Sequence, residues 1–356
     1  MGKIRSLLLI CGIIVIFNSC ETDFDTIADW EDITVVYCLL NQKDSIHYLK
    51  VNKAFLGEGN ALVYAQEQDS ISYPYSLDAW IEEWTAEGDS LRVAFQFDTT
   101  SAFQKEPGMF YYPDQILYKG GPDNWYKIKY IIQPPNDTVG FEKIWFNEDH
   151  IFKLKIRNPN TGKIIWSETI LVNDFRITEP STSGQFIKFV ENPLYPRTFE
   201  WKRAPNDEDG RFRYELNVEF NFREYKNNGD SLDRTLPLTS AVAYPSSGTD
   251  LISVSYWDYS FYSTCNSEIP YSDPAVEQTI VKRKSLNINT IVGVAAEEFN
   301  LYMQVYEPST SIVQEKPPYT NVENGIGLFS SRYKNNTTKL LHPESIYDLD
   351  IDLKFR

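Results

Sequence analysis

Short apolar runs with a period of two, separated by turn residues, constrain the fold of this chain more than any other feature. In the longest run, residues 212–225, every second residue from Tyr214 to Phe220 is apolar and the residues between them are polar or charged. Successive side chains of a strand point to opposite faces, so this alternation indicates a strand with one buried face. Similar runs follow one another from residue 33 onward, with Gly, Asn, Asp and Pro between them. The succession predicts a protein that is all-β or mostly β.

Two hairpins and one buried strand are the clearest local predictions. Residues 151–172 form one hairpin around a turn at 158–163, and residues 77–97 form the other around a turn at 87–90. Residues 33–40 are almost continuously apolar, which is typical of a buried strand.

Helices are expected at few places. In residues 295–306, apolar side chains recur at i, i+3, i+4 and i+7 from Phe299, which predicts one short helix. Residues 60–68 are a second, weaker helix candidate with Asn60 as N-cap. We predict strands for the aromatic stretch 252–261 and for the terminal stretch 347–355, where Asp alternates with Leu and Ile.

The first twenty residues have the plan of a secretory signal that ends in a cysteine. A basic head is followed by an apolar run over residues 6–17, which is shorter than the roughly 20 residues of a membrane-spanning helix. Ser19 then precedes Cys20 directly, and this resembles the relaxed lipobox of bacterial lipoproteins. The resemblance implies a signal peptide over residues 1–19 and lipid attachment to Cys20. The alternative is an ordinary signal peptide with a chance cysteine.

Residues 20–32 are rich in acidic side chains and follow the proposed lipid anchor. Acyl chains contribute about 0.8 kcal/mol of membrane affinity for each buried methylene, and two chains already anchor a protein stably. The stretch resembles the acidic tether that directs such lipoproteins to the outer surface of the outer membrane, where the chain is then expected to face the cell exterior. An ordinary linker with several charges is the other interpretation.

Charge and composition exclude several classes of function. The formal net charge of −16 disfavours binding to nucleic acid and a polybasic grip on anionic lipid. The three histidines have no second ligand at metal-binding spacing, and no Gly-x-Ser-x-Gly motif occurs. We therefore expect no catalytic residues, no cofactor and no metal. Because 50 acidic residues provide many carboxylate pairs, a glycan-active enzyme stays as a weaker alternative.

Two cysteines, Cys38 and Cys265, are left once the signal peptide and the acylated cysteine are set aside. They are expected to be buried free thiols in strands. A disulfide between two domains is the alternative.

The tryptophans allow two interpretations, as core residues or as a platform on which sugars stack. The residues concerned are Trp80, Trp84, Trp125, Trp145, Trp166, Trp201 and Trp257. Trp125 and Tyr126 lie in a stretch rich in Gly, Pro and Asn, so we single them out as candidate ligand or partner contacts. Residues 324–327 (Asn-Gly-Ile-Gly) predict either a turn with positive φ or a recognition loop.

The tripeptide Asp-(Ser/Thr)-(aliphatic or Thr) is unusually frequent. It resembles the O-glycosylation acceptor of exported Bacteroidota proteins, and hairpins also generate it because Asp-Ser ends turns before a strand. The candidate acceptors are Thr26, Ser45, Ser70, Ser90, Thr99, Thr138 and Ser231.

A loop-rich stretch at 178–184 divides the mature chain into two predicted domains. The first comprises residues 33–178, with an irregular insertion at 113–147. The second, also β-rich, comprises residues 179–356. We expect both to be β-sandwich-like.

Several segments together resemble a family of Bacteroidota outer-membrane lipoproteins that carry a domain of unknown function and are often encoded near TonB-dependent transporters. The resemblance implies an Ig-like or carboxypeptidase-regulatory-like first domain and supplies no catalytic residues. The matching segments are residues 35–40, 48–55, 107–111, 152–172, 297–299, 308–310 and 320–329.

The function expected from these features is that of a surface-exposed lipoprotein. It would act as a non-catalytic accessory or ligand-binding partner of a TonB-dependent transporter, attached to the outer membrane by its lipid. A structural or adhesive cell-surface protein is the alternative.

Overall fold

The computed structural model of this protein describes residues 32–44, 46–55, 71–100, 116–120, 126–131, 138–143, 146–246, 249–269, 274–306 and 319–355. These residues form four β-sheets and a few short helices, so the prediction of a mostly β protein is confirmed. The signal peptide, Cys20 and most of the acidic tether lie outside the described residues, as does the helix candidate at 60–68. None of the described helices is long and apolar enough to cross a membrane.

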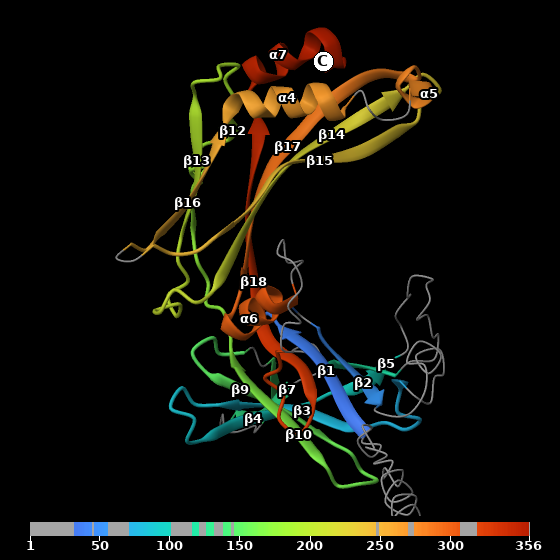
Figure 1. The fold of residues 1–356 in the computed structure, drawn as a ribbon, viewed down its shortest axis with the longest axis vertical. Helices are drawn as coiled ribbons and strands as arrows, with labels where there is room; N and C mark the ends of the chain where they lie inside the picture. Colours follow the sequence, from blue (N-terminus) through green and yellow to red (C-terminus); the bar gives the residue numbers. More distant parts are fainter. Residues whose placement is uncertain are drawn as a thin grey trace, which may run out of the picture.

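A nine-stranded sheet runs along the whole length of the molecule and connects a lower and an upper body (Figure 1). A two-residue strand, β12 (Phe186–Ile187), pairs with β18 beside the main path. The other strands follow one another in space as β15 (Ser231–Ala243), β14 (Arg213–Lys226), β17 (Ile280–Ala295), β18 (Ile326–Leu341), β1 (Asp32–Leu40), β2 (His47–Phe55), β6 (Leu117–Gly120) and β5 (Asp98–Thr100).

Strand β18 belongs to both bodies. Its first part, residues 326–331, pairs in parallel with β1 of the lower body. Its second part, residues 332–339, pairs antiparallel with β17 of the upper body. A segment near the end of the chain thus completes the sheet that begins the described chain, as the red strand beside the blue one in Figure 1 shows.

The lower body is a sandwich in which a four-stranded sheet faces β1 and β2. This sheet has the order β10 (Ile164–Ile170), β9 (Ile151–Arg157), β3 (Asp78–Trp84) and β4 (Leu91–Gln96), so both predicted hairpins are confirmed. Every second residue of each strand points inward. The core between the sheets includes Val36, Leu40, Leu49, Ile81, Phe95, Phe152, Leu154 and Ile156, together with Val322 and Phe329 from the end of the chain.

The upper body packs a smaller sheet and two helices against β14, β17 and β18. The smaller sheet has the order β11 (Ile177–Glu179), β13 (Pro196–Lys202) and β16 (Leu251–Trp257), and the helices are α4 (Asp258–Glu268) and α7 (Pro343–Leu353). A short helix, α5 (Pro274–Glu277), precedes β17. Core residues include Phe189, Phe199, Trp201, Tyr214, Leu216, Phe220, Phe261, Ile288, Val292, Tyr333 and Phe355.

The predicted terminal strand is wrong, because most of residues 347–355 belong to helix α7. His342 caps this helix, with its Nδ1 accepting from the Glu344 backbone N–H, and Pro343 occupies the first turn. Leu349 and Leu353 are buried at i and i+4, so the sequence that alternates as a strand would also places its apolar residues on one face of a helix. The capping residue His342, Pro343 in the first turn and the packing of this apolar face favour the helix over the strand.

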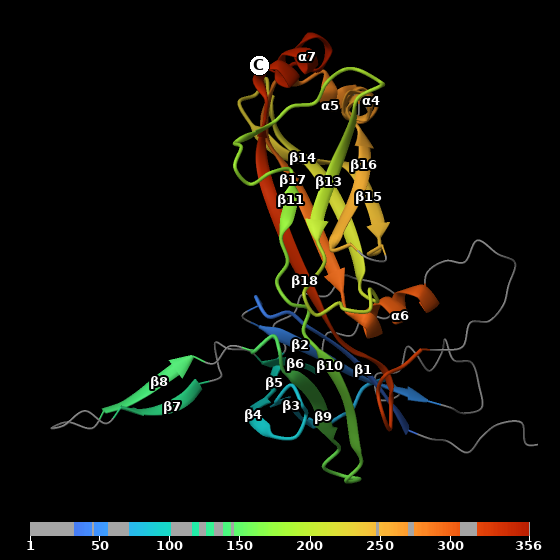
Figure 2. The ribbon, with the colours of Figure 1, turned by 90° about the vertical axis from the view of Figure 1, so that its left-hand side faces the viewer.

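The strand predicted over 252–261 is correct only as far as Trp257, where helix α4 begins. The single helix expected near 295–306 exists as α6 (Glu297–Tyr306), but it is not the only one. The stretch 113–147 is not irregular throughout, because it contains β6, β7 (Tyr126–Ile131) and β8 (Thr138–Lys143). Strands β7 and β8 pair as a separate ribbon that projects from the lower body in Figure 2.

The two cysteines lie in different cores and are free. Cys38 is in β1, as predicted for a strand, whereas Cys265 is in helix α4, so its predicted strand position is wrong. Burial raises the pKa of the Cys38 thiol to about 12 and raises the pKa of Cys265 well above its ordinary value. Both thiols are therefore protonated and unreactive in the folded protein at neutral pH.

Candidate functional site

Two adjoining hollows lie where the lower and upper bodies meet, on either side of α6. The first has a volume of about 420 Å³ and is bordered by β1, β2 and α6. The second, of about 500 Å³, is bordered by β14, β17, β18 and α6. Asp44, Phe299 and Arg332 border both. Each volume falls within the range of roughly 300–1,000 Å³ that is usual for ligand pockets, and we call the pair the junction site.

Helix α6 presents its apolar stripe to the junction site because its polar side is the one held in the protein. Asn300 is its buried residue, and the Asn300 Nδ2 donates to the Arg211 backbone carbonyl at 2.8 Å. The Asn300 Oδ1 accepts from the Tyr244 hydroxyl at 3.2 Å. The apolar residues that predicted this helix therefore border the hollows, Phe299 both of them, Tyr302 the first and Met303 the second.

Glu298 ties α6 to two strands of the lower body. Its Oε2 accepts from the Ser330 hydroxyl in β18 at 3.1 Å and from the Thr169 hydroxyl in β10 at 3.3 Å. Burial raises the pKa of Glu298 above its ordinary value, although these hydrogen bonds oppose the shift. The neighbouring Glu297 pairs with Arg211 at 3.0 Å. These contacts fix the helix that separates the two hollows.

Three tyrosines border the first hollow and a fourth packs against one of them; we call Tyr37, Tyr48, Tyr302 and Tyr306 the tyrosine cluster. The rings of Tyr37 and Tyr302 meet edge-on with centroids 6.1 Å apart, and those of Tyr302 and Tyr306 are 4.4 Å apart. Tyr37 is 39% exposed, Tyr48 43% and Tyr306 52%. Burial raises the pKa of Tyr302 well above its ordinary value, so its hydroxyl stays protonated and donates to Tyr37.

The tyrosine cluster explains the continuous apolar run at residues 33–40. Even-numbered residues of β1 point into the lower core, as predicted for a buried strand. Tyr37 and Leu39 point to the other side and border the first hollow, so only one face of the predicted buried strand is fully buried. An apolar face that no layer of the protein covers fully is a common mark of a binding surface.

Charged groups of both signs border the hollows. Arg332 is exposed, and its guanidinium has no hydrogen bond or ion pair with any residue that the structure describes. The Asp44 carboxylate accepts from the Asn41 side chain at 3.1 Å. Lys50 lies on the same outward face of β2 as Tyr48. The site thus combines aromatic faces with a free guanidinium, which suits a ligand or peptide segment that has an apolar body and a polar or anionic group.

His47 borders the first hollow from within the lower core. Its ring is 2% exposed and stacks on Phe146 with centroids 4.8 Å apart. Burial lowers the pKa of His47 to about 4, so the imidazole is neutral at pH 7. Across the described ranges, no three His, Cys, Asp or Glu side chains lie close enough together to hold a metal ion.

Several residues predicted from sequence as contacts or modification sites cannot be placed at the junction site. Trp125, Cys20, Thr26, Ser45 and Ser70 lie outside the described residues. Tyr126 and Thr138 are the first residues of β7 and β8.

Three of the candidate glycosylation residues, Ser90, Thr99 and Ser231, have exposed side chains. Ser90 directly precedes β4, Ser231 is the first residue of β15, and Thr99 is the middle residue of β5. Both interpretations of the tripeptide, as a glycan acceptor and as the end of a turn, agree with this placement.

The turn at residues 324–327 has the positive φ that its sequence predicts. Asn324 has a φ of 59° and Gly327 a φ of 122°. The Asn324 side chain donates to the Ile164 carbonyl at 2.9 Å, and so the turn closes one edge of the four-stranded sheet.

The tryptophans divide between buried and outward-facing positions. Trp201 is fully buried in the upper core. Trp80, Trp84 and Trp166 lie on the outer side of the four-stranded sheet, away from its core. Trp257 is 51% exposed at the end of β16.

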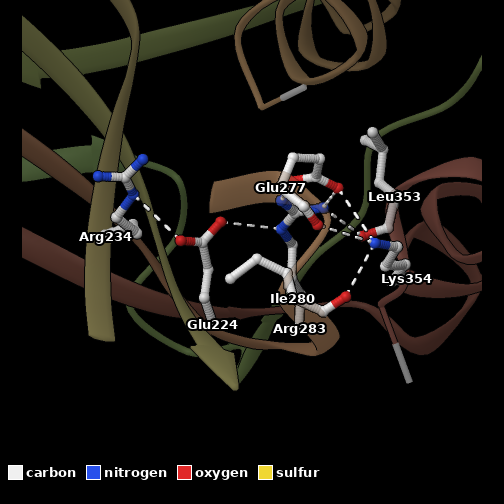
Figure 3. A network of polar contacts seen from close by, with 7 residues as sticks. All are labelled: Glu224, Arg234, Glu277, Ile280, Arg283, Leu353 and Lys354. Carbon is white, nitrogen blue, oxygen red and sulfur yellow. Dashed lines mark hydrogen bonds and ion pairs between the residues drawn. The ribbon is translucent and has the colours of Figure 1, made fainter. Parts of the chain in front are cut away.

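The strongest buried charge cluster has a structural role (Figure 3). Arg283 is fully buried; its Nε donates to Glu224 at 3.0 Å, an Nη to the Leu353 carbonyl at 3.0 Å, and it pairs with Glu277. Lys354 joins the network through Glu277 and the Ile280 carbonyl. The cluster ties the end of α7 to the strands of the upper sheet, and its charged groups pair with one another.

Comparison with family models and with curated proteins finds no match to this chain.

Proposed function

We propose that this chain is a lipid-anchored protein of the bacterial outer membrane that faces the cell exterior and acts as a non-catalytic binding accessory of a TonB-dependent transporter. The observation that supports a binding role is the junction site, where a helix and a strand present uncovered aromatic residues beside a free Arg332. The anchoring part rests on Ser19-Cys20 and on the acidic stretch behind it.

We also propose that the lower body is an Ig-like or carboxypeptidase-regulatory-like domain. Its two sheets packed face to face support this assignment, together with the family resemblance of its segments. In this arrangement the lower body follows the tether, and the junction site is held away from the membrane.

The transporter is tested by purifying the lipid-anchored protein from its own outer membrane in a mild detergent. We expect a TonB-dependent transporter to co-purify and to be identified by mass spectrometry. Tyr302→Ala combined with Arg332→Glu should reduce its recovery at least tenfold. Tyr347→Ala is the matched control, because Tyr347 is 70% exposed in α7 at the far end of the upper body. Reproducible absence of a transporter would refute this function.

Intact-mass measurement of the purified protein tests the anchor. We expect a chain that begins at Cys20 and carries acyl groups, and Cys20→Ser should leave the signal peptide uncleaved. Additional mass in hexose-sized steps would identify the acceptor tripeptides as glycosylated. A mass equal to the lipidated polypeptide would exclude those glycans.

A structural or adhesive role is the second candidate, favoured by the free edge of β15. This strand has 13 residues, lies at the end of the nine-stranded sheet and has mostly exposed side chains. Long free edges can pair with strands of other chains. Assembly of the purified protein into polymers, in place of a complex with a transporter, would support this role.

A further inference from the structure

The outer side of the four-stranded sheet carries a pattern of tryptophans and charges that the junction site does not explain. Trp80 in β3 and Trp166 in β10 lie opposite Lys155, which is in the strand between them. In the next row, Glu82 and Glu168 lie on either side of Lys153. Trp84 follows in the third row. We call this surface the tryptophan face.

Its spacing comes directly from the sheet. Trp80 and Trp166 are two strands apart, which is about 10 Å at the usual strand separation, and Trp80 and Trp84 are four residues apart, about 13 Å along one strand. The lower core lies between this sheet and β1, so the tryptophan face and the tyrosine cluster point in opposite directions.

The indole rings are held in place by one carboxylate. The Nε1 groups of Trp80 and Trp84 donate to the two oxygens of Glu82, at 3.0 and 2.9 Å. Lys155 lies 2.9 Å from the same group. Burial by these neighbours alone would raise the pKa of Glu82, but the hydrogen bonds and the charge of Lys155 outweigh it and lower the pKa, so Glu82 is ionised. Preorganised rings lose little entropy when a ligand binds.

The charges on this face are paired with one another. Glu82 neutralises Lys155, and Glu168 lies 3.6 Å from Lys153. Lys153 also covers one side of the Trp84 ring, with its Nζ 4.7 Å from the centroid. The surface therefore has no net field to attract an ion, but it offers hydrogen-bond donors and acceptors between aromatic rings.

We propose that the tryptophan face is a binding site for a neutral polysaccharide. A pyranose ring has an apolar face of C–H groups, which suits the negative face of an indole, and a rim of hydroxyls, which suits Glu168 and the lysines. Ring contacts at fixed spacing across one face of a sheet match a chain of sugars. This inference is independent of the proposed transporter and of the junction site.

Other classes of ligand fit less well. The centre of a protein–protein interface is usually depleted of charge, whereas the middle row here is Glu82, Lys153 and Glu168. The net charge of −16 opposes nucleic acid and anionic lipid.

Affinity electrophoresis of the chain from Glu21 onward tests the proposal, with native gels that contain mixed-linkage β-glucan, galactomannan or glucomannan. We expect at least one of these polysaccharides to retard the protein. Trp80→Ala and Trp166→Ala should each weaken the association at least tenfold, and Trp166→Phe, which keeps an aromatic ring, should retain most of it. Trp257→Ala, an exposed tryptophan of the upper body, should leave the retardation unchanged.

Circular dichroism identifies variants that fail to fold. If Trp80→Ala fails, Trp166→Ala decides, because Trp166 is 38% exposed on the outermost strand of the sheet. The proposal is overturned if none of the three polysaccharides retards the protein or if only polygalacturonate, a polyanion, does so. It is also overturned if both alanine variants bind as the parent does. Loss of the sugar site should leave co-purification of a transporter intact, so the two proposals fail separately.

Discussion

Arg283 and Glu224 show how a single buried ion pair constrains the end of this chain. Both side chains are almost completely buried, and Arg283 also holds the Leu353 carbonyl at the end of α7. A buried pair of this kind contributes little relative to an apolar pair, but removing one partner leaves the other charge buried without compensation. The pair therefore makes the position of α7 depend on one guanidinium.

Replacing Arg283 by Met should lower the free energy of unfolding by about 3–5 kcal/mol, because Glu224 then keeps only Arg234, at 3.3 Å. Urea denaturation followed by circular dichroism measures the change. Arg223→Met is the matched control on the neighbouring strand β14, since the Arg223–Asp233 pair is exposed and its loss should have little effect. Equal losses in the two variants would contradict the role assigned to the buried cluster.

His47 makes stability depend on pH in a defined window. Burial lowers its pKa to about 4 in the folded protein, against the ordinary value of 6.5, so between these values the unfolded chain binds a proton that the folded protein does not. The free energy of unfolding should therefore fall by about 3 kcal/mol as the pH decreases from 6.5 to 4. Above pH 6.5 the contribution of the neutral His47 to stability should be fully present.

The variant His47→Phe, which preserves the stacking on Phe146, should lose this part of the pH dependence. Unfolding in urea at pH 7 and pH 4.5 measures it as the difference between parent and variant. The carboxylates titrate in both proteins and cancel in that comparison. A parallel pH profile in the two proteins would show that His47 is not the group responsible.

At the scale of elements, β18 is the strand on which both bodies depend, and Gly327 permits its approach to β1. The φ of Gly327 is 122°, a backbone conformation in which residues other than glycine are strained. A Cβ at this position would lie 2.0 Å from the Val36 carbonyl oxygen, so the two strands would have to separate.

Gly327→Ala should accordingly cost about 3 kcal/mol or more in the free energy of unfolding. Gly162→Ala provides the comparison, because Gly162 also has a positive φ of 73° but nothing lies within 4 Å of its added Cβ. Its cost should be about 1 kcal/mol. If thermal and urea denaturation place both variants at the same stability, the close packing of β18 on β1 is not what Gly327 provides.

The comparison of sequence and structure is most instructive in β1 and α6. A short, almost continuous apolar run predicts β1 and a period of 3.6 predicts α6, and both elements are correct because such local patterns distinguish strand from helix. The same patterns do not reveal that Tyr37 and Phe299 meet at one hollow, since the contact joins residues far apart in the chain. The parallel pairing of β18 with β1 is equally invisible in a single sequence. Helix α7 is missed because its sequence alternates as a strand would, and its packing against the upper body selects the helix.

At the scale of the whole molecule, two hydrophobic cores share one strand. Phe329 of β18 is buried in the lower core and Tyr333, four residues later, in the upper core. Helix α6 adds a second connection through the hydrogen bonds of Glu298. When one body unfolds, β18 loses its pairing partner there, and the sheet of the other body loses support. We therefore expect the two bodies to unfold as one cooperative unit.

The two buried thiols allow this cooperativity to be measured, because Cys38 reports on the lower core and Cys265 on the upper one. In the chain from Glu21 onward, Cys265→Ser and Cys38→Ser each leave one thiol. Labelling with a thiol reagent across a urea gradient should then give the same midpoint for the two variants, because neither core can open while β18 stays paired. Adding Gly327→Ala should shift both midpoints together, although the substitution is at the lower core. Separate midpoints, or a shift confined to Cys38, would show two bodies that merely share a strand and unfold independently.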